Sequence, residues 1–255
     1  MTSRGLQLHR VAKSFGALPV LGDISLHVAE GEFVTIVGPS GAGKSTILRL
    51  LTGTETPDAG SLLFNGKPLG AGNARFAFMP QRDALMPWRR IIDNAALGLE
   101  VQGLGRAEAR AKVAPLFAPF GLSGFERHYP AQLSGGMRQR AALLRTIVQA
   151  HDMLLLDEPF GALDALTRAG MQEWLQGMWA NHRWTALLIT HDVREAVFLS
   201  DRIYLLSGRP ARVLREFKVP LSRPRRLADL GSAEARAIET DILEILLHRE
   251  TASRI

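Results

Sequence analysis

The chain has 255 residues, and its 46% hydrophobic content is enough to bury the core of one large α/β domain. It contains no cysteine, which excludes disulfide bonds and thiolate metal sites. It opens with polar residues and has no run of about 18 apolar residues, so we expect a cytosolic chain without a membrane-spanning helix.

The net charge of +6 raises the question of an anionic partner. Eight basic residues and one acidic residue, Glu216, lie between positions 202 and 226: Arg202, Arg209, Arg212, Arg215, Lys218, Arg223, Arg225 and Arg226. A solvated protein face and a surface close to acidic lipid headgroups both agree with this stretch. Because no DNA-reading helix or zinc module is visible, we expect no nucleic-acid partner.

The first half of the chain predicts a strand, a glycine-rich loop and a helix, in that order. The strand is the apolar run GEFVTIVG at 31–38, and the helix follows the loop at 47–51. Next, Asn65-Gly66 within 61–69 indicates a hairpin turn, so an antiparallel piece accompanies the first strand. From 87 to about 118 the pattern becomes helical.

The second half alternates strands with helices. Apolar runs at 153–157 and 185–190 have the length of strands and flank a helical segment at 163–178, and 233–247 reads as a terminal amphipathic helix. Alternation of this kind predicts an α/β fold with a parallel sheet covered on both faces.

The loop after the first strand has the composition of a phosphate-binding loop. It reads GPSGAGKST and fits the pattern G-x-x-x-x-G-K-[ST] between a strand and a helix. Its glycines let backbone N–H groups surround an anion, the lysine adds a full charge, and the serine hydroxyl suits Mg²⁺. The expected nucleotide-binding residues are Gly38, Pro39, Ser40, Gly41, Ala42, Gly43, Lys44, Ser45 and Thr46.

Three further patterns have both a functional and a purely structural interpretation. Asp157 and Glu158 leave the strand at 153–157 in opposite directions, so one can hold Mg²⁺ and the other polarise a water molecule, or both can be a solvated loop end. His191 follows the strand at 185–190 as a γ-phosphate contact or as a structural residue. In LSGGMRQR, Ser134, Gly135 and Gly136 form a second anion cradle or an ordinary capped helix.

Six motifs occur in one order along the chain: GPSGAGKST, the glutamine in FMPQRD, LSGGMRQR, MLLLDEP, GALDA and LLITHD. Together they resemble the nucleotide-binding subunit of ATP-binding cassette (ABC) transporters, over nearly the whole chain. The resemblance implies a P-loop NTPase fold, in which a RecA-like core is joined by an antiparallel β subdomain and a helical subdomain at about 86–152. We therefore expect a single nucleotide-binding domain over 1–255, whose last helix spans about 233–247.

The resemblance also implies roles for particular residues. Phe15 stacks on adenine; Gln81 contacts Mg²⁺ and the attacking water; Glu158 is the catalytic base; His191 contacts the γ-phosphate; and Asp164 communicates between subunits. Ser45, Gln81 and Asp157 form the metal set. Two copies meet head to tail, so that Ser134, Gly135 and Gly136 of one copy close on ATP held by the other.

The implied partners are transmembrane permease subunits, a second copy of the chain and, indirectly, a substrate-binding protein, at the cytoplasmic face of the inner membrane. A coupling helix of the permease would dock on 81–90. In the alternative interpretation, this segment is a surface loop in which Trp88 packs inward. The signature has Met137 where many relatives carry glutamine. This methionine and the stretch after Gln81 are similar to importers of nitrate, sulfonates, taurine or thiamine-precursor pyrimidines.

Two other functions share part of this pattern. A small-molecule kinase would also carry the phosphate loop, but it would have no reason to carry LSGGMRQR. A soluble ABC-type ATPase of DNA repair or translation would carry all the motifs, although such proteins usually have two cassettes or a long coiled-coil insertion. Neither a second cassette nor such an insertion is present in these 255 residues.

Overall fold

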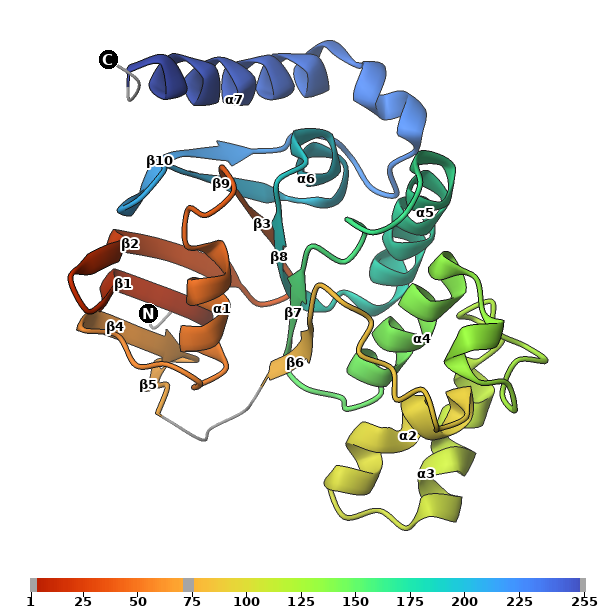
Figure 1. The fold of residues 1–255 in the computed structure, drawn as a ribbon. Helices are drawn as coiled ribbons and strands as arrows, with labels where there is room; N and C mark the ends of the chain where they lie inside the picture. The colour runs from red at the N-terminus through yellow and green to blue at the C-terminus, as the bar shows by residue number, and fades with distance from the viewer. Residues whose placement is uncertain (1–3, 71–75, 253–255) are drawn as a thin grey trace. The chain divides into compact units, whose positions relative to one another are not determined.

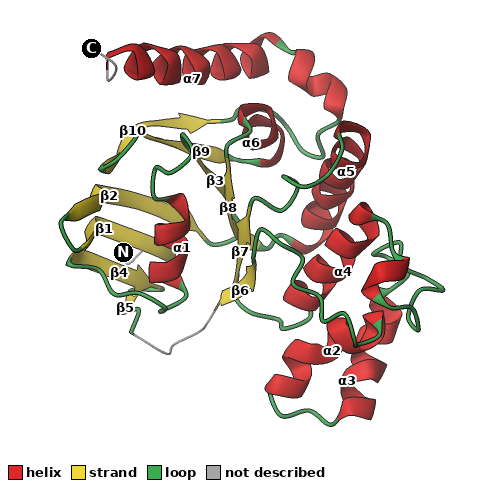
Figure 2. Ribbon diagram, viewed as in Figure 1, coloured by secondary structure: helices red, strands yellow, loops and turns green. Residues whose placement is uncertain are grey.

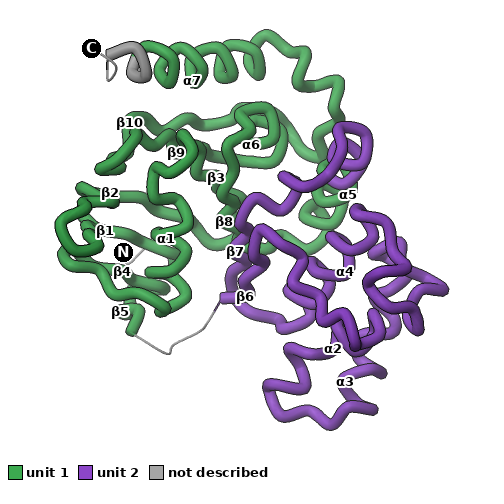
Figure 3. The backbone as a smooth tube through the Cα atoms, in the orientation of Figure 1, with its two compact units in different colours: residues 1–74, 172–255 green, residues 75–171 purple. Residues whose placement is uncertain are grey.

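The computed structural model describes residues 4–70 and 76–252. The chain divides into two compact units, coloured separately in Figure 3. Unit 1 comprises residues 1–74 and 172–255, and unit 2 comprises residues 75–171. The helical subdomain expected at about 86–152 falls inside unit 2, and its bounds stay a prediction.

Unit 1 contains a mixed sheet with the strand order β5-β4-β1-β2-β10-β9-β3-β8 (Figure 1). Strand β3 pairs in parallel with both β8 and β9, whereas β1 pairs antiparallel with β2 and β4. The strands are β1 (Gly5–Phe15), β2 (Leu18–Ala29), β3 (Phe33–Val37), β4 (Ala59–Phe64), β5 (Lys67–Pro68), β8 (Thr185–Thr190), β9 (Arg202–Leu206) and β10 (Ala211–Lys218).

The expected antiparallel hairpin lies at β4 and β5. Asn65 and Gly66 both have positive φ, 51° and 74°, as the tight turn between antiparallel strands requires. All five residues of β3 and all six of β8 are buried, which explains their nearly continuous apolar sequences. The sequence therefore predicted both kinds of strand in unit 1 correctly.

Among the described residues, the helical segments that lie wholly in unit 1 are α1 (Lys44–Leu51), α6 (Val193–Leu199), the short 3₁₀ segment η3 (Leu227–Gly231) and α7 (Ala233–Ala252). Helix α1 buries Ile47, Leu48, Leu50 and Leu51. Helix α7 packs against α6 (Figure 1). None of the helices in the described ranges has the length and apolar character needed to cross a bilayer.

Unit 2 combines two parallel strands with helices, coloured yellow and red in Figure 2. The strands are β6 (Phe76–Met79) and β7 (Met153–Asp157), and the helices are α2 (Ile91–Val101), α3 (Arg106–Val113), α4 (Gly135–Ile147) and the 3₁₀ turns η1 (Ala114–Leu116) and η2 (Pro130–Gln132). Helix α5 (Ala165–His182) starts in unit 2 and ends in unit 1. Helix α2 packs on both α3 and α4.

The basic stretch 202–226 is not a uniformly solvated face, and that expectation is wrong for three of its arginines. The side chains of Arg202, Arg223 and Arg225 are only 17%, 10% and 1% exposed. Arg202 forms three hydrogen bonds, of 2.6, 2.7 and 2.8 Å, to the carboxylate of Glu32. Part of the positive charge is therefore used inside unit 1 rather than on its surface.

Candidate functional site

The phosphate loop connects β3 to α1 in unit 1 and ends in a residue that must be glycine. Gly43 has φ +100°, and a Cβ atom there would lie 2.7 Å from Cγ1 of Val20. Lys44, the first residue of α1, is buried, and its Nζ donates to the carbonyl oxygens of Gly38 at 2.7 Å and Pro39 at 2.9 Å. The ammonium group of Lys44 therefore lies over the loop, against the carbonyl oxygens of its first two residues.

The N-terminus of α1 is suited to bind an anion. No acidic residue lies in its first turn, and the N-cap residue Gly43 offers no side chain to satisfy the first N–H groups. These N–H groups, the helix dipole and Lys44 together make a positive cradle. Ser45 is exposed in the same turn and can offer its hydroxyl to a cation.

His191 lies at the same edge of the sheet as the phosphate loop. Strands β3 and β8 run parallel and in register, with Val37 opposite Thr190. Gly38 and His191 therefore follow paired residues, and the structure brings the predicted histidine to the start of the loop. Because the carboxyl ends of parallel strands form the usual binding edge of an α/β sheet, this placement agrees with a ligand contact.

Phe15 is also in unit 1, at the end of β1, and the residue is 40% exposed. Its cross-strand partner is Leu18, and two residues further along β2 Val20 packs against Gly43 of the phosphate loop. Nζ of Lys13 lies 5.4 Å from the ring centroid. An exposed aromatic face at this end of the strand is available for stacking.

The second group of predicted residues lies in unit 2, where Gln81 and Glu158 form a direct contact. Nε2 of Gln81 donates to Oε2 of Glu158 at 3.0 Å, although 77 positions separate the two residues. Glu158 has φ +44°, an uncommon conformation for a residue other than glycine, and its carbonyl oxygen accepts from the N–H of Gly161 at 3.1 Å. Asp157 is the last residue of β7 and Glu158 follows it.

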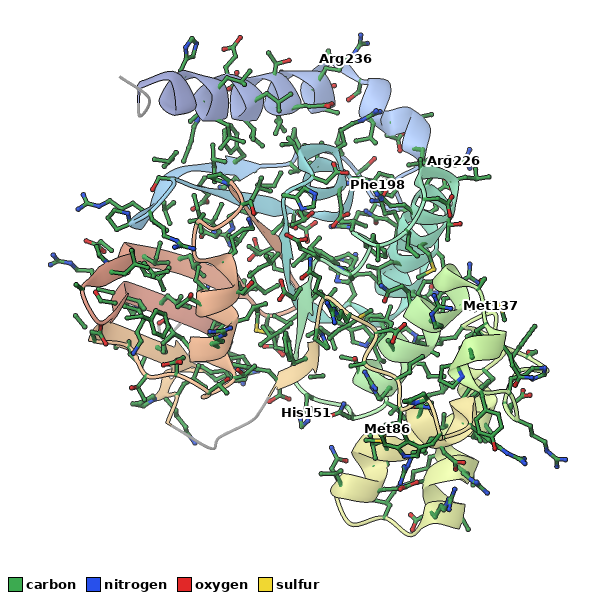
Figure 4. All side chains as sticks on the ribbon, in the orientation of Figure 1. Met86, Met137, His151, Phe198, Arg226 and Arg236 are labelled. Atoms are coloured by element: carbon green, nitrogen blue, oxygen red, sulfur yellow. The ribbon has the colours of Figure 1, made fainter. Side chains whose placement is uncertain are left out.

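The signature segment, residues 133–140, also lies in unit 2. Ser134 is the N-cap of α4, and its Oγ accepts from the N–H of Met137, labelled in Figure 4, at 3.3 Å. A Cβ atom on Gly136 would lie 2.7 Å from Cγ2 of Thr167. Asp164 accepts from the N–H of the same Thr167 at 3.0 Å. The signature segment and the GALDA segment therefore meet at Thr167.

Two physical properties of this region bear on ligand binding. Hydrogen bonds from Thr167 hold the pKa of the Asp164 carboxyl below its usual range, so it is a carboxylate at neutral pH. A cavity of about 530 Å³ is lined by three segments of unit 2, two loops and the first turns of helix α4. Its lining residues are Gln81, Arg82, Asp83, Gly135, Arg138, Gln139, Gly161, Ala162 and Leu163.

Arg209 lies beside the phosphate loop, although its sequence context marks it only as a member of the basic stretch 202–226. Nε of Arg209, in the turn between β9 and β10, donates to the carbonyl oxygen of Gly41. No local pattern in the sequence signals this contact, because it depends on β9 lying parallel and next to β3.

The described residues contain no group of three or more His, Cys, Asp or Glu side chains arranged to hold a metal ion by themselves. Their candidate donors are oxygen atoms instead: the Ser45 hydroxyl in unit 1, and the Gln81 amide and Asp157 carboxylate in unit 2. This donor chemistry fits Mg²⁺, which takes oxygen ligands and is usually bound by one or two carboxylates plus phosphate oxygens and water.

Residues 21–161 match the family model described as ABC transporter. The chain belongs to this family. The matched residues include the phosphate loop, Gln81, the signature segment, Asp157 and Glu158, so the predicted family is confirmed. The chain is an ATP-binding cassette with the fold of a P-loop ATPase.

Curated relatives cover most of the chain. A formylaminopyrimidine import ATP-binding protein of Halalkalibacterium halodurans is 41% identical over 90% of this chain and 90% of its own length. An aliphatic sulfonates import ATP-binding protein of Pseudomonas aeruginosa is 44% identical over 95% of this chain and 84% of its own length, and one of Cupriavidus necator is 45% identical over 91% and 76%.

Solved structures confirm the fold class. A dimeric structure of a bacterial ABC transporter cassette superposes with a TM-score of 0.73 at 29% identity, covering 85% of this chain and 100% of the other. A structure of the same cassette in a post-hydrolysis state, bound to ADP and phosphate, gives 0.72 at 28% identity over the same shares. Both neighbours were solved as dimers.

Proposed function

We propose that this chain is the ATP-hydrolysing subunit of a membrane importer for a small molecule. The observation that carries the proposal is the phosphate loop at the carboxyl edge of the unit 1 sheet, where Lys44 lies over Gly38 and His191 follows the residue paired with Val37. In this interpretation the loop amides and Lys44 bind the β- and γ-phosphates, Phe15 stacks on adenine and His191 contacts the γ-phosphate.

Hydrolysis requires a positioned water molecule, and Glu158 is the proposed general base. Its carboxylate accepts a hydrogen bond from Gln81, which fixes its orientation and places an amide beside it. Such a pair can hold a water in line with the γ-phosphate and take its proton. Mg²⁺ would be held by Ser45, Gln81 and Asp157 together with phosphate oxygens, and would neutralise the charge that develops on them.

The proposed working unit contains two copies of the chain, as in the dimeric cassettes to which it is similar. Ser134 and Gly135 of one copy then complete the site that the phosphate loop of the other begins. Their position at the N-terminus of α4, where Ser134 is the N-cap residue, supports this role. ATP binding closes the pair, and hydrolysis with phosphate release opens it.

The importer role and its substrate rest on relatives whose names specify import of formylaminopyrimidine or of aliphatic sulfonates. We propose a transported molecule of these two classes, a peripheral position at the cytoplasmic face of the membrane, and permease subunits as partners. Trp88 is 73% exposed in the segment 81–90, which supports docking of a permease helix there and disfavours the inward-packed alternative. The DNA-repair or translation alternative is not favoured by these relatives.

A reconstitution tests the proposal. The chain and a candidate permease would be placed in vesicles with Mg-ATP, and uptake of radiolabelled aliphatic sulfonate or formylaminopyrimidine would be measured with and without a binding protein. We expect ATP-dependent uptake of one of the two, and none without Mg²⁺. Stimulation of ATPase activity by nucleic acid, with no response to the permease, would support the alternative instead.

A further inference from the structure

The inference concerns α6, the seven-residue helix that directly follows His191. Its N-cap is Asp192, whose carboxylate accepts from the N–H of Glu195 at 3.1 Å. The N–H of Asp192 donates to Oγ1 of Thr190, the last residue of β8, at 3.0 Å. His191 is therefore held between the end of a strand and the cap of a helix, and its position follows that of α6.

The opposite end of α6 is held by two arginines from a distant part of the chain. One guanidinium nitrogen of Arg225 donates to the carbonyl oxygens of Val197 at 3.0 Å, Phe198 at 3.0 Å and Ser200 at 2.7 Å. Arg223 donates to the carbonyl oxygen of Leu199 at 2.6 Å. Four consecutive carbonyls, which a helix end leaves without partners in the helix, are thus satisfied by two side chains.

Arg223 also connects α6 to other parts of unit 1. Its remaining donors bind the Asp201 carboxylate at 2.8 Å and the Gln176 side-chain oxygen at 2.6 Å, and its guanidinium lies 4.1 Å from the centroid of a Trp179 ring. The other carboxylate oxygen of Asp201 accepts from the N–H of Phe33 at 2.9 Å. This contact reaches the start of β3, the strand that ends in the phosphate loop.

Because the two arginines are buried, they cost more free energy than an ordinary helix end requires. The Arg225 side chain is 1% exposed, and burial lowers its pKa to about 10, so it still carries its charge at neutral pH. Replacing buried ionic groups by apolar residues is often neutral or even stabilising. The two buried arginines at the end of α6 are therefore better explained by a need to fix the position of the helix than by a gain in stability.

We propose that Arg223 and Arg225 are positioning residues, which hold α6 so that His191 is fixed against the γ-phosphate. We name the pair with its carbonyl partners 197–200 the arginine clamp. Figure 4 labels Phe198, one of its carbonyl acceptors, and Arg226, the next residue after the clamp. The inference rests on the proposed role of His191. The clamp residues lie just before η3 and α7, so the clamp also connects this C-terminal segment to the nucleotide site.

The first experiment compares two clamp variants of the full chain, Arg223→Gln and Arg225→Lys, with the control Arg226→Gln, which removes an exposed neighbouring arginine. Displacement of a catalytic contact predicts a fall in kcat of roughly 10- to 100-fold for the clamp variants. KM for ATP should change less than about twofold, because the binding contacts come from the phosphate loop. Arg226→Gln should match the parent.

Repeating each clamp change in a His191→Ala background separates positioning from general damage. If the clamp acts through His191, the second change causes no further loss of turnover, because the group it positions is already absent. Equal losses in both backgrounds, or unchanged kcat in the clamp variants, would overturn the inference. His191→Ala alone with the parent's turnover would instead refute the proposed role of His191. If Arg223→Gln does not fold, Arg225→Lys, which keeps a buried cation, decides the outcome.

Discussion

The two units of this cassette use different parts of the chain for their chemistry. In unit 1 the proposed phosphate site consists mainly of backbone groups of one continuous loop, with Lys44 as its one side-chain cation inside the loop. In unit 2 the proposed hydrolytic site depends on side chains from separate segments, such as Gln81 with Glu158 and Ser134 at a helix cap. The comparison suggests that nucleotide binding and hydrolysis can be impaired separately.

The largest expected effect follows from removing the carboxylate of unit 2 while leaving unit 1 intact. Glu158→Gln keeps the shape of the side chain but cannot accept a proton, so kcat should fall by ~10²- to 10⁴-fold. ATP affinity, measured by equilibrium titration with a fluorescent analogue, should stay close to that of the parent. Near-parental turnover would remove Glu158 from its proposed role.

The reverse separation comes from the phosphate loop. Lys44→Ala removes the ammonium group that lies over Gly38 and Pro39, and hydrogen bonds to charged groups are worth about 1.5–3 kcal/mol each, so ATP affinity should fall at least tenfold. The matched control is Lys67→Ala, which removes an exposed lysine of the same unit. Unchanged affinity of the Lys44 variant in calorimetry would contradict the assignment of the loop.

A backbone substitution should affect the same loop without changing its charge. Gly43→Ala introduces a Cβ that would lie 2.7 Å from Val20 at a φ of +100°, so the loop must distort. We expect weaker ATP binding together with a loss of about 1–3 kcal/mol in the free energy of unfolding. Gly16→Ala is the control, since it too has positive φ but no neighbour within 4 Å of the added atom. Equal effects of both changes on ATP affinity would show that crowding at Gly43 is unimportant.

The smallest expected effect concerns the stability of unit 2. Burial opposes ionisation of Asp93, but hydrogen bonds from Arg106 and Arg110 outweigh it and lower its pKa below 3.8. The ionised form therefore stabilises the fold above about pH 4, and this contribution disappears as the pH falls through the lowered pKa. Asp93→Asn should cost about 1–3 kcal/mol at pH 7 in urea unfolding, and less at pH 3. A difference that does not depend on pH would contradict this explanation.

The fold was predictable where the information is local. The apolar runs that became β3, β7 and β8, the Asn65-Gly66 turn and the glycine loop before α1 each carry their structure in a few neighbouring residues. The terminal helix expected at 233–247 begins at Ala233 and continues to Ala252, because no proline or glycine follows to end it.

The remaining contacts were not visible in the residues alone because they join distant positions. The Gln81–Glu158 hydrogen bond spans 77 positions, and the contact of Arg209 with Gly41 depends on the pairing of β9 with β3. From the sequence, Arg223 and Arg225 look like surface charge. They are buried because the end of α6 supplies their guanidinium groups with carbonyl oxygens. Local composition does not contain that information.

The central claim is that two copies of the chain share each ATP site, and complementation between two inactive variants tests it directly. His191→Ala damages the site in the copy that holds ATP, whereas Ser134→Arg damages the site that the copy lends to its partner. In a mixed head-to-tail pair one site combines two intact halves, so an equal mixture should recover up to about a quarter of parental ATPase activity. If the mixture hydrolyses ATP no faster than the two variants do separately, while both remain folded, each chain works alone and the claim is wrong.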